Sequence, residues 1–467
     1  MRFFRGIILL LCASACAAAP RQPSGPVRQP IAVVSALIDA AQPGDTVRIP
    51  PGVYEGNLVV RKPVTIEGGG AAVFDGLGRG TVVEITVPGV TLRGCIVRAS
   101  GDDVTSEPAA IRALTGPVTI ESNRVEDSLF GIDLREAPDS VIRGNDVRCK
   151  PLDPERRGDG IRLWWSHGCL IEGNTAHESR DMVFWYSENL TIRNNTVTSS
   201  RYGLHFMYSH DTTLAHNTLS GNSVGIYLMY SNRIALIDNR MFNNRGASGY
   251  GLGLKDCDDI LIRGNALLAN RVGVYVDNSP SSAGSTGIFE SNMIAFNEIG
   301  LLATPNTHSN VFVANAFIEN EEPATTHGRG RLTNNTFARE GVGNYWSDYA
   351  GLDLNSDGIG DSPYEPRSLF GAILASEPNL RLFVHSPAQR AVEFTARALP
   401  ELRPEPMLID PAPLATPPEI GSGIPETPRS PAPTAALAAG LLLSAFGVVF
   451  ALGHERRAPP IPEGSHA

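Results

Sequence analysis

A four-residue motif recurs ten times through the middle of the chain: an apolar residue, two variable positions and an asparagine. The asparagines follow one another at intervals of 20 to 29 residues and are Asn123, Asn145, Asn174, Asn195, Asn217, Asn239, Asn265, Asn292, Asn315 and Asn335. In phase with this motif, a glycine precedes an apolar–variable–apolar triplet, first at Gly131 and last at Gly273. This alternation of short apolar segments with glycine, asparagine and serine turns predicts two or three short β-strands in each repeat.

The repeat length and the short strands predict one coil of a parallel β-helix per repeat. Asparagines at equivalent places in stacked coils can hydrogen-bond to one another and hold the turn backbone. A leucine-rich repeat, the competing solenoid, would need Leu-x-x-Leu-x-Leu and helical segments, and the repeats contain neither. Residues 31–41 have helical apolar spacing and predict a helix that covers the open end of the solenoid. This cap and its strands resemble the all-β, right-handed, pectate-lyase-like β-helix.

The two ends of the chain carry targeting signals. A basic start, a short apolar run and small residues predict a secretory signal, with lipidation of Cys16 left open. An uncharged stretch followed by two arginines predicts a transmembrane helix that anchors a periplasmic domain in the inner membrane, a buried helix being the alternative. The predicted segments are a signal peptide (1–19), a β-helix domain with N-terminal cap and C-terminal extension (20–397), a Pro-rich linker (398–434), the transmembrane helix (435–453) and a cytoplasmic tail (454–467).

The net charge of −10, from 39 basic and 49 acidic residues, argues against a nucleic-acid partner, which would require a basic patch. The six cysteines include no Cys-x-x-Cys pair, which argues against a zinc site. Two interpretations stay open for the four cysteines beyond the signal segment. They form one or two disulfides or are buried thiols: Cys95, Cys149, Cys169 and Cys257.

One side of each coil carries the candidate chemistry. When the coils are aligned on the serine after each glycine strand, the residues three and five positions earlier are apolar and should point inward. The residues two and four positions earlier should therefore point outward. Together with the residue just before the serine, they form a soft, aromatic surface suited to a partner or ligand: Trp164, Trp185, Tyr186, Tyr208, Tyr227, Tyr230 and Lys255.

Met207 and Met229 fall one coil apart on this surface, and His205 is two residues from Met207. Thioether and imidazole groups are the ligands that select Cu(I). The candidate copper ligands are Met207, Met229, His205, His210, His167 and Met182. Sugar stacking on the aromatic rings and an apolar protein interface are the alternatives.

Sugar-processing enzymes are the main rival class, because a uronate lyase or epimerase uses this kind of scaffold with acidic residues and a base. Residues 202–207 resemble the Tyr-Gly-Phe-Asp-Pro-His motif of alginate epimerases, but the last three positions are His205, Phe206 and Met207. The outward positions also lack the paired carboxylates of a glycosidase. We therefore expect no catalytic residues and no enzyme activity, with a carbohydrate-binding or uronate-processing β-helix as the alternative.

Longer strings carry a family resemblance: GDGIRLWWSHG (158–168), SRDMVFWYS (179–187), SRYGLHFMYSHD (200–211), GIYLMYS (225–231), LGLKDCDD (252–259), HSPAQRAVE (385–393) and LIDPAPL (408–414). These strings resemble the NosD family of nitrous oxide reductase maturation proteins. The resemblance implies a periplasmic copper-maturation factor without catalysis that helps to assemble the reductase's copper–sulfide centre. We expect the outward methionine, histidine and aromatic residues to hold Cu(I) transiently or to receive a partner. It also implies as partners an ABC transporter ATPase and permease, a copper chaperone and the reductase. An adaptor that binds these partners without metal is the second rival.

A separate acidic loop follows the repeats. Its oxygen ligands alternate and a glycine stands at the sixth place, which resembles half of a calcium loop. The glutamate expected twelve positions along is Tyr364 instead. The candidate residues for a structural calcium ion are Asp353, Asn355, Asp357 and Asp361, and an asparagine- and aspartate-rich turn is the alternative.

Overall fold

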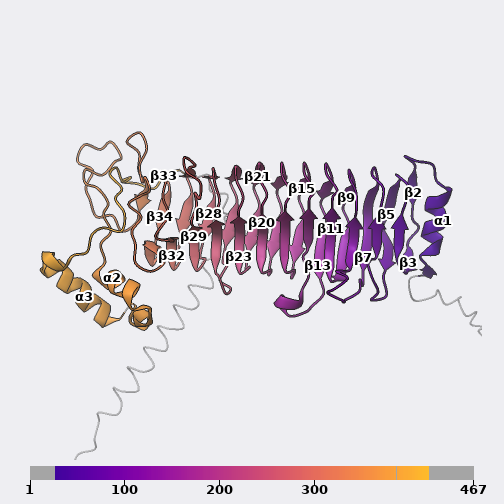
Figure 1. Ribbon diagram of the computed structural model, residues 1–467, viewed down its shortest axis with the longest axis horizontal. Coiled ribbons are helices and arrows are strands. Elements are labelled where there is room, and N and C mark those ends of the chain that lie inside the picture. Colours follow the sequence, from indigo (N-terminus) through magenta and orange to yellow (C-terminus); the bar gives the residue numbers. More distant parts are fainter. Residues whose placement is uncertain (1–26, 385, 420–467) are drawn as a thin grey trace, which may run out of the picture. The chain divides into compact units, whose positions relative to one another are not determined.

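A computed structural model describes residues 27–384 and 386–419. The predicted signal peptide, transmembrane helix and tail lie outside these residues. The described residues form a right-handed parallel β-helix in which successive coils stack along the sequence (Figure 1), as the repeat predicts. Between residues 27 and 419, no helix is long and apolar enough to cross a membrane.

Each coil has three sides, and equivalent strands of successive coils pair in parallel. The first side is a twelve-stranded sheet made of β4 (Leu58–Val60), β6 (Val83–Ile85), β8 (Ala109–Ala113), β11 (Phe130–Arg135), β14 (Ile161–Trp164), β17 (Asp181–Trp185), β20 (Tyr202–Met207), β23 (Val224–Met229), β26 (Tyr250–Lys255), β29 (Val272–Asp277), β32 (Ile299–Ala303) and β35 (Glu322–Thr326).

The other two sides share the long strands β5 (Thr65–Asp75) and β7 (Thr91–Arg98). The second side continues through β2 (Thr46–Arg48), β9 (Thr119–Glu121), β12 (Val141–Arg143), β15 (Leu170–Glu172), β18 (Thr191–Arg193), β21 (Thr212–Ala215), β24 (Ile234–Ile237), β27 (Leu261–Arg263), β30 (Gly287–Glu290) and β33 (Asn310–Val313). The third continues through β1 (Arg28–Pro30), β3 (Gly52–Glu55), β10 (Arg124–Ser128), β13 (Asp146–Cys149), β16 (Thr175–His177), β19 (Thr196–Thr198), β22 (Thr218–Ser220), β25 (Arg240–Phe242), β28 (Ala266–Leu268), β31 (Met293–Ala295), β34 (Ala316–Ile318) and β36 (Tyr345–Trp346).

The interior is filled by apolar side chains that stack coil over coil. The rings of Phe184 and Phe206, for example, stack with centroids 4.8 Å apart. Helix α1 (Ala32–Ala40) covers the N-terminal end and buries Val34 and Ile38 against the core, which confirms the predicted cap. Burial of these alternating residues, at about 25 cal/mol per Å² of apolar surface, drives the coils to stack.

The predicted asparagine ladder runs along the corner between the second and third sides. Asn217 shows the pattern: its backbone N–H and its Nδ2 both donate to Asn239 Oδ1, at 3.0 and 2.9 Å. One member differs from the prediction, because Asn344 and not Asn335 accepts from Asn315. Asn335 instead accepts from Asn310, at the corner between the first and second sides, so the motif match at residue 335 had the wrong corner.

The other two corners have ladders of their own. The serine used to align the coils forms one, in which the backbone N–H of Ser187 donates to Ser209 Oγ at 3.1 Å. The second was not predicted, although an asparagine three residues before the repeat glycine signals it in several coils. Its side chains, buried except for the last, pass hydrogen bonds from coil to coil along Asn222, Asn244, Asn270, Asn297 and Asn320.

The C-terminal part of the described chain closes the solenoid. It contains α2 (Leu369–Ser376) and α3 (Pro387–Ala398), with 3-10 turns at Pro378–Phe383 and Pro400–Leu402, and a further turn at Pro154–Arg156 lies earlier in the chain. Buried Asp410 then ends the asparagine ladder by accepting from the backbone N–H of Asn344 at 2.8 Å and from Trp346 Nε1 at 2.9 Å. The expected linker from residue 398 therefore begins later, because Leu408 and Asp410 are fully buried.

The four described cysteines are buried and unpaired, which favours the thiol alternative over disulfides. Burial raises the pKa of the Cys257 thiol to about 12, so this sulfur stays protonated at neutral pH. These thiols pack like small apolar side chains.

Replacing Asn217 with alanine should lower the free energy of unfolding by about 2–4 kcal/mol, because four buried hydrogen bonds of its side chain are lost, three to neighbouring asparagines and one to the Ile192 carbonyl. Urea denaturation followed by circular dichroism measures this change. Asn379→Ala, at an exposed position, is the control and should change stability by less than about 0.5 kcal/mol. Equal effects of the two variants would contradict a stabilising role for the ladder.

Candidate functional site

The outer surface of the first side carries two rows of side chains in the predicted register. We call the first the methionine row, in which Met207 pairs with Met229 between neighbouring strands β20 and β23. Neighbouring strands lie about 4.8 Å apart, so the two thioethers occupy adjacent positions. From β14 to β29, the methionine row consists of Trp164, Trp185, Met207, Met229, Lys255 and Asp277.

The second row, the histidine row, differs from the sequence expectation in its exposure. Its outward orientation follows from the alternation in β20, where Leu204 and Phe206 lie in the core. Yet His205 is only 5 % exposed, because neighbouring rings cover it. The row consists of Arg112, Asp133, Arg162, Val183, His205 and Tyr227.

The two nitrogens of His205 have different surroundings. Its Nδ1 lies 3.0 Å from Asp181 Oδ2, and an ionised carboxylate can only accept a hydrogen bond. In the neutral imidazole, this contact places the ring proton on Nδ1 and leaves Nε2 with a free lone pair. The Nε2 atom is buried and has no hydrogen-bond partner in the described chain. His205 therefore presents an unused acceptor that a metal ion or a donor group could occupy.

Asp181 is well placed to keep this arrangement. The carboxylate is fully buried, and Arg201 contacts both of its oxygens. Burial opposes ionisation, but the hydrogen bonds from Arg201 and His205 outweigh it and hold the pKa of Asp181 below its ordinary value. A carboxylate behind an imidazole is the usual second partner of a metal-binding histidine.

Two aromatic rings pack against the imidazole of His205 in T-shaped arrangements. The Trp185 ring lies 5.8 Å away at an interplanar angle of 87°, and the Tyr202 ring lies 4.9 Å away at 85°. Trp185 Nε1 is itself buried without a hydrogen-bond partner among the described residues. An unsatisfied donor and an unsatisfied acceptor thus lie near each other, beside Met207 of the same strand.

The other predicted copper ligands are placed differently. His167 and His210 each accept a backbone N–H of the next coil on Nδ1, at 3.1 Å in both cases. A neutral imidazole whose Nδ1 accepts a hydrogen bond carries its proton on Nε2. A metal could bind Nε2 only if this proton moved to Nδ1, and Nδ1 would then no longer accept the backbone N–H. Met182 lies fully buried in the core and points away from this surface. The structure therefore brings together His205, Met207 and Met229, and separates the other three.

An aromatic ladder of four residues runs beside the methionine row. Successive rings stack with centroids 5.0 to 5.3 Å apart and planes within 13° of parallel, in the order Trp165, Tyr186, Tyr208 and Tyr230. Each residue has a positive φ near 50°, which is rare for large side chains. Because neighbouring rings cover each other's faces, the ladder mainly presents ring edges outward. Sugars stack on ring faces, so this geometry favours a protein partner over a saccharide.

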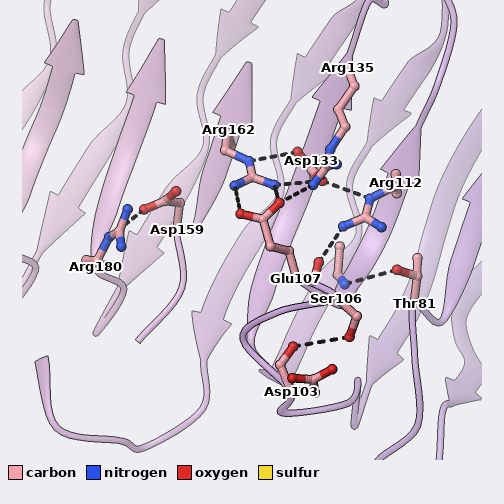
Figure 2. Close-up of polar contacts among 11 residues, drawn as sticks. Thr81, Asp103, Ser106, Glu107, Arg112, Asp133, Arg135, Asp159, Arg162 and Arg180 are labelled. Atoms are coloured by element: carbon pink, nitrogen blue, oxygen red, sulfur yellow. Dashed lines mark hydrogen bonds and ion pairs between the residues drawn. The ribbon is translucent and has the colours of Figure 1, made fainter. Parts of the chain in front are cut away.

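A network of charged residues fills the N-terminal end of the histidine row. Asp133 is fully buried and lies among three arginines, accepting from Arg112 Nε at 2.8 Å and from Arg162 Nε at 2.9 Å (Figure 2). Burial opposes its ionisation, but the arginines hold the pKa of Asp133 below its ordinary value. Glu107, from the loop before β8, reaches over the sheet to Arg162 at 3.0 Å and also pairs with Arg135. This loop therefore covers part of the outer surface of the first side.

Charged residues form the C-terminal end of the methionine row. Lys255 Nζ lies 3.1 Å from Asp277 Oδ2 and 3.5 Å from Asp256 Oδ2. The hydrogen bond from Lys255 to Asp277 raises the pKa of this lysine, which keeps it cationic. The soft part of the row is therefore limited to the two tryptophans and the two methionines.

The acidic loop has the geometry of an asparagine- and aspartate-rich turn. Asp353 accepts the backbone N–H groups of Asp357 at 3.2 Å and Gly358 at 2.9 Å, and Asp361 accepts that of Leu354. No group of three or more histidine, cysteine, aspartate or glutamate side chains in residues 27–384 and 386–419 is arranged to hold a metal ion. Calcium binding by this loop stays a prediction.

Comparison with known proteins gives two matches to family models. Residues 146–351 match a family described as periplasmic copper-binding protein (NosD), and residues 81–197 match a right-handed β-helix region. A curated Pseudomonas aeruginosa protein, named probable ABC transporter binding protein NosD, is 31 % identical over 366 residues, which cover 75 % of this chain and 84 % of the relative. Its namesake from Stutzerimonas stutzeri is 29 % identical over 370 residues, covering 76 % and 84 %.

Solved structures share the fold at lower identity. The A-module of mannuronan C-5 epimerase AlgE4 from Azotobacter vinelandii aligns with a TM-score of 0.42 and 17 % identity, over 65 % of this chain and 93 % of that one. The catalytic domain of a GH87 α-1,3-glucanase aligns with a TM-score of 0.45 and 15 % identity, over 71 % of each chain.

Asp159 gives this region a measurable pH dependence. Burial, together with nearby Asp181, raises its pKa to about 7, although the Arg180 cation opposes the shift. The folded state therefore binds a proton between pH 4 and 7 that the unfolded state releases, and stability falls as pH rises through that window. We expect the free energy of unfolding of Asp159→Asn, measured relative to that of the wild type, to rise by about 2 kcal/mol from pH 5 to pH 7.

Urea denaturation at both pH values measures this difference. The amide introduced by Asp159→Asn would still offer a carbonyl oxygen to Arg180, which now donates to Asp159 Oδ1 at 3.1 Å. Asp102→Asn, at an exposed position, should show no such pH dependence. If the two proteins differed in their free energy of unfolding by the same amount at both pH values, the raised pKa of Asp159 would be contradicted.

Proposed function

The chain belongs to the NosD family of periplasmic proteins, and from this premise we propose that it holds Cu(I) transiently on the first side of its β-helix. It then passes the metal on during assembly of the copper–sulfide centre of nitrous oxide reductase. Copper is the cargo of this protein, which carries out no catalysis of its own. The bound site consists of His205 Nε2 and the thioethers of Met207 and Met229.

One observation carries this proposal. His205 Nε2 is buried without a hydrogen-bond partner in the described chain, and it belongs to the same strand as Met207. Leaving a buried acceptor unpaired costs about 1–3 kcal/mol, so the fold bears a cost that a ligand would remove. The adjacent thioethers identify the kind of ligand, because a soft donor set with one imidazole favours Cu(I) over hard cations.

The surroundings suit a metal that must leave again. Thioethers are neutral and need no deprotonation to bind, unlike thiolates, so copper can arrive and depart with little change in protonation. Asp181 holds the imidazole in the tautomer that offers Nε2 to the metal. The rings of Trp185 and Tyr202 exclude water from one side of the site, which slows oxidation of Cu(I) by dissolved oxidants.

The aromatic ladder provides the surface on which a partner docks. Trp165 is 50 % exposed and Tyr208 is 41 % exposed, large values for aromatic residues outside an interface. Tyrosine and tryptophan dominate the energetically important parts of protein interfaces. The proposed partners are a copper chaperone, the reductase, and the ATPase and permease of an ABC transporter. Predicted export and the predicted membrane helix at 435–453 would hold the protein at the inner membrane, beside such a transporter.

A Cu(I) titration against a competing chromophoric chelator tests the methionine pair. We expect the purified protein to bind one tight equivalent, and Met207→Leu/Met229→Leu to bind at least about tenfold more weakly, or about 1.4 kcal/mol. Met293→Leu on β31 is the control, because Met293 is also half-buried but lies on the third side of the coil. Absence of tight copper in every protein would support the adaptor that binds partners without metal.

The histidines give a second, separate test. His205→Gln should weaken Cu(I) binding by about tenfold or more, because it removes the free imidazole nitrogen. His210→Gln should leave the affinity within about twofold, since His210 uses Nδ1 to hold the next coil. X-ray absorption at the copper edge would report loss of the nitrogen ligand in the first variant only. The reverse order of effects would contradict the assignment of His205.

A further inference from the structure

Helix α3 has one side that nothing in the described chain covers. It packs on α2 through the side that contains Ala396, which is 5 % exposed. Ala391, Phe394 and Ala398 recur at spacings of three and four residues, so they form an apolar stripe along one side of the helix. All three are exposed, and Phe394 is 73 % exposed.

Further apolar side chains are exposed before and after α3 in the sequence. Leu382, in the 3-10 turn before α3, is 90 % exposed, and Leu399, directly after α3, is 49 % exposed. Large apolar residues gathered in one short segment usually mark an interaction site, whereas scattered ones need no explanation. The stripe therefore needs an occupant.

The charges of α3 indicate what that occupant is. Glu393 is the helix's one acidic residue, and its Oε1 accepts from Ser368 Oγ at 2.6 Å and from the backbone N–H of Phe370 at 2.9 Å. This carboxylate thus points toward the N-terminus of α2. Arg390 and Arg397 lie one turn before and one turn after Phe394, and both are exposed. The uncovered side of α3 is consequently apolar along its middle and positive at both ends.

We propose that this side of α3 lies on an anionic lipid bilayer, with Phe394 inserted at the level of the headgroups and both arginines paired with lipid phosphates. An apolar stripe flanked by basic side chains is the pattern of an interfacial helix, and arginine can keep its stem in the apolar layer while its head stays among the headgroups. Each basic residue near an anionic surface adds to the attraction. This surface is independent of the copper site.

The length of the chain allows this contact. The described residues end at 419, and the predicted transmembrane helix starts at 435. The 15 residues between them span at most about 50 Å when fully extended, so an anchor at 435 would hold residue 419 within that distance of the membrane, which is compatible with the contact. A protein surface could also cover this stripe, but it would need acidic groups opposite both Arg390 and Arg397, whereas an anionic bilayer offers phosphates everywhere.

Tryptophan quenching in the full-length protein tests the proposal. Phe394→Trp adds a fifth tryptophan to the four present, and its emission should be quenched in vesicles containing brominated phosphatidylglycerol. We expect an additional loss of roughly one fifth of the signal relative to the wild type, from one tryptophan in five. Phe296→Trp is the matched control, because Phe296 is 60 % exposed on a turn of the solenoid and should not be quenched.

The lipid composition and the arginines complete the test. The quenching should disappear in brominated phosphatidylcholine vesicles and in the Phe394→Trp/Arg390→Glu/Arg397→Glu protein. Copper binding should be unchanged in all of these variants, so failure here would leave the proposed function standing. Equal quenching in both vesicle types would overturn the anionic preference. No quenching in either, with a blue shift only after adding the purified permease, would assign the stripe to a protein partner instead.

Discussion

The hydrogen bonds between buried turn residues of successive coils are the interaction on which this structure depends. At each corner a buried polar group must find a partner in the dry interior, and the next coil supplies it. In the asparagine ladder, one side-chain oxygen accepts two N–H groups of the preceding residue, so a shift of the strand by one position would leave several donors unpaired. Burial of the apolar rows stabilises stacking in general, whereas the ladders fix which residue stacks on which.

This fixed register also determines the outer surface. Because Ser209 and Asn217 anchor their coil at two corners, the strand before them has no freedom to slide, and Met207 must pair with Met229. Side chains that are far apart in sequence therefore lie next to each other, separated by about the distance between two neighbouring strands. If copper binds here as proposed, the backbone that carries its ligands is already fixed before the metal arrives, which lowers the entropy cost of binding.

Much of this arrangement was predictable from the sequence because the repeat is regular. The coil, the cap and the pairing of the methionine row all follow from equivalent positions in successive repeats. Two features did not follow, and both depend on residues outside the repeat. The tenth ladder residue is Asn344, because the loop before it breaks the period, and the end of the ladder is Asp410, which is distant in sequence. No periodicity connects Asp410 to the corner that it closes.

The burial of His205 was unpredictable for a related reason. Alternation correctly places this side chain on the outer surface, where a solvated imidazole would be expected. Its surroundings come from neighbouring coils, with Asp181 and Trp185 one coil earlier. A carboxylate beneath the ring and aromatic side chains beside it turn a surface position into a desolvated one, where a free lone pair is costly. The β-helix thus pairs the buried polar groups at its corners but leaves one imidazole nitrogen without a hydrogen-bond partner on its outer side. This nitrogen lies next to two thioethers, and the proposed copper chemistry depends on it.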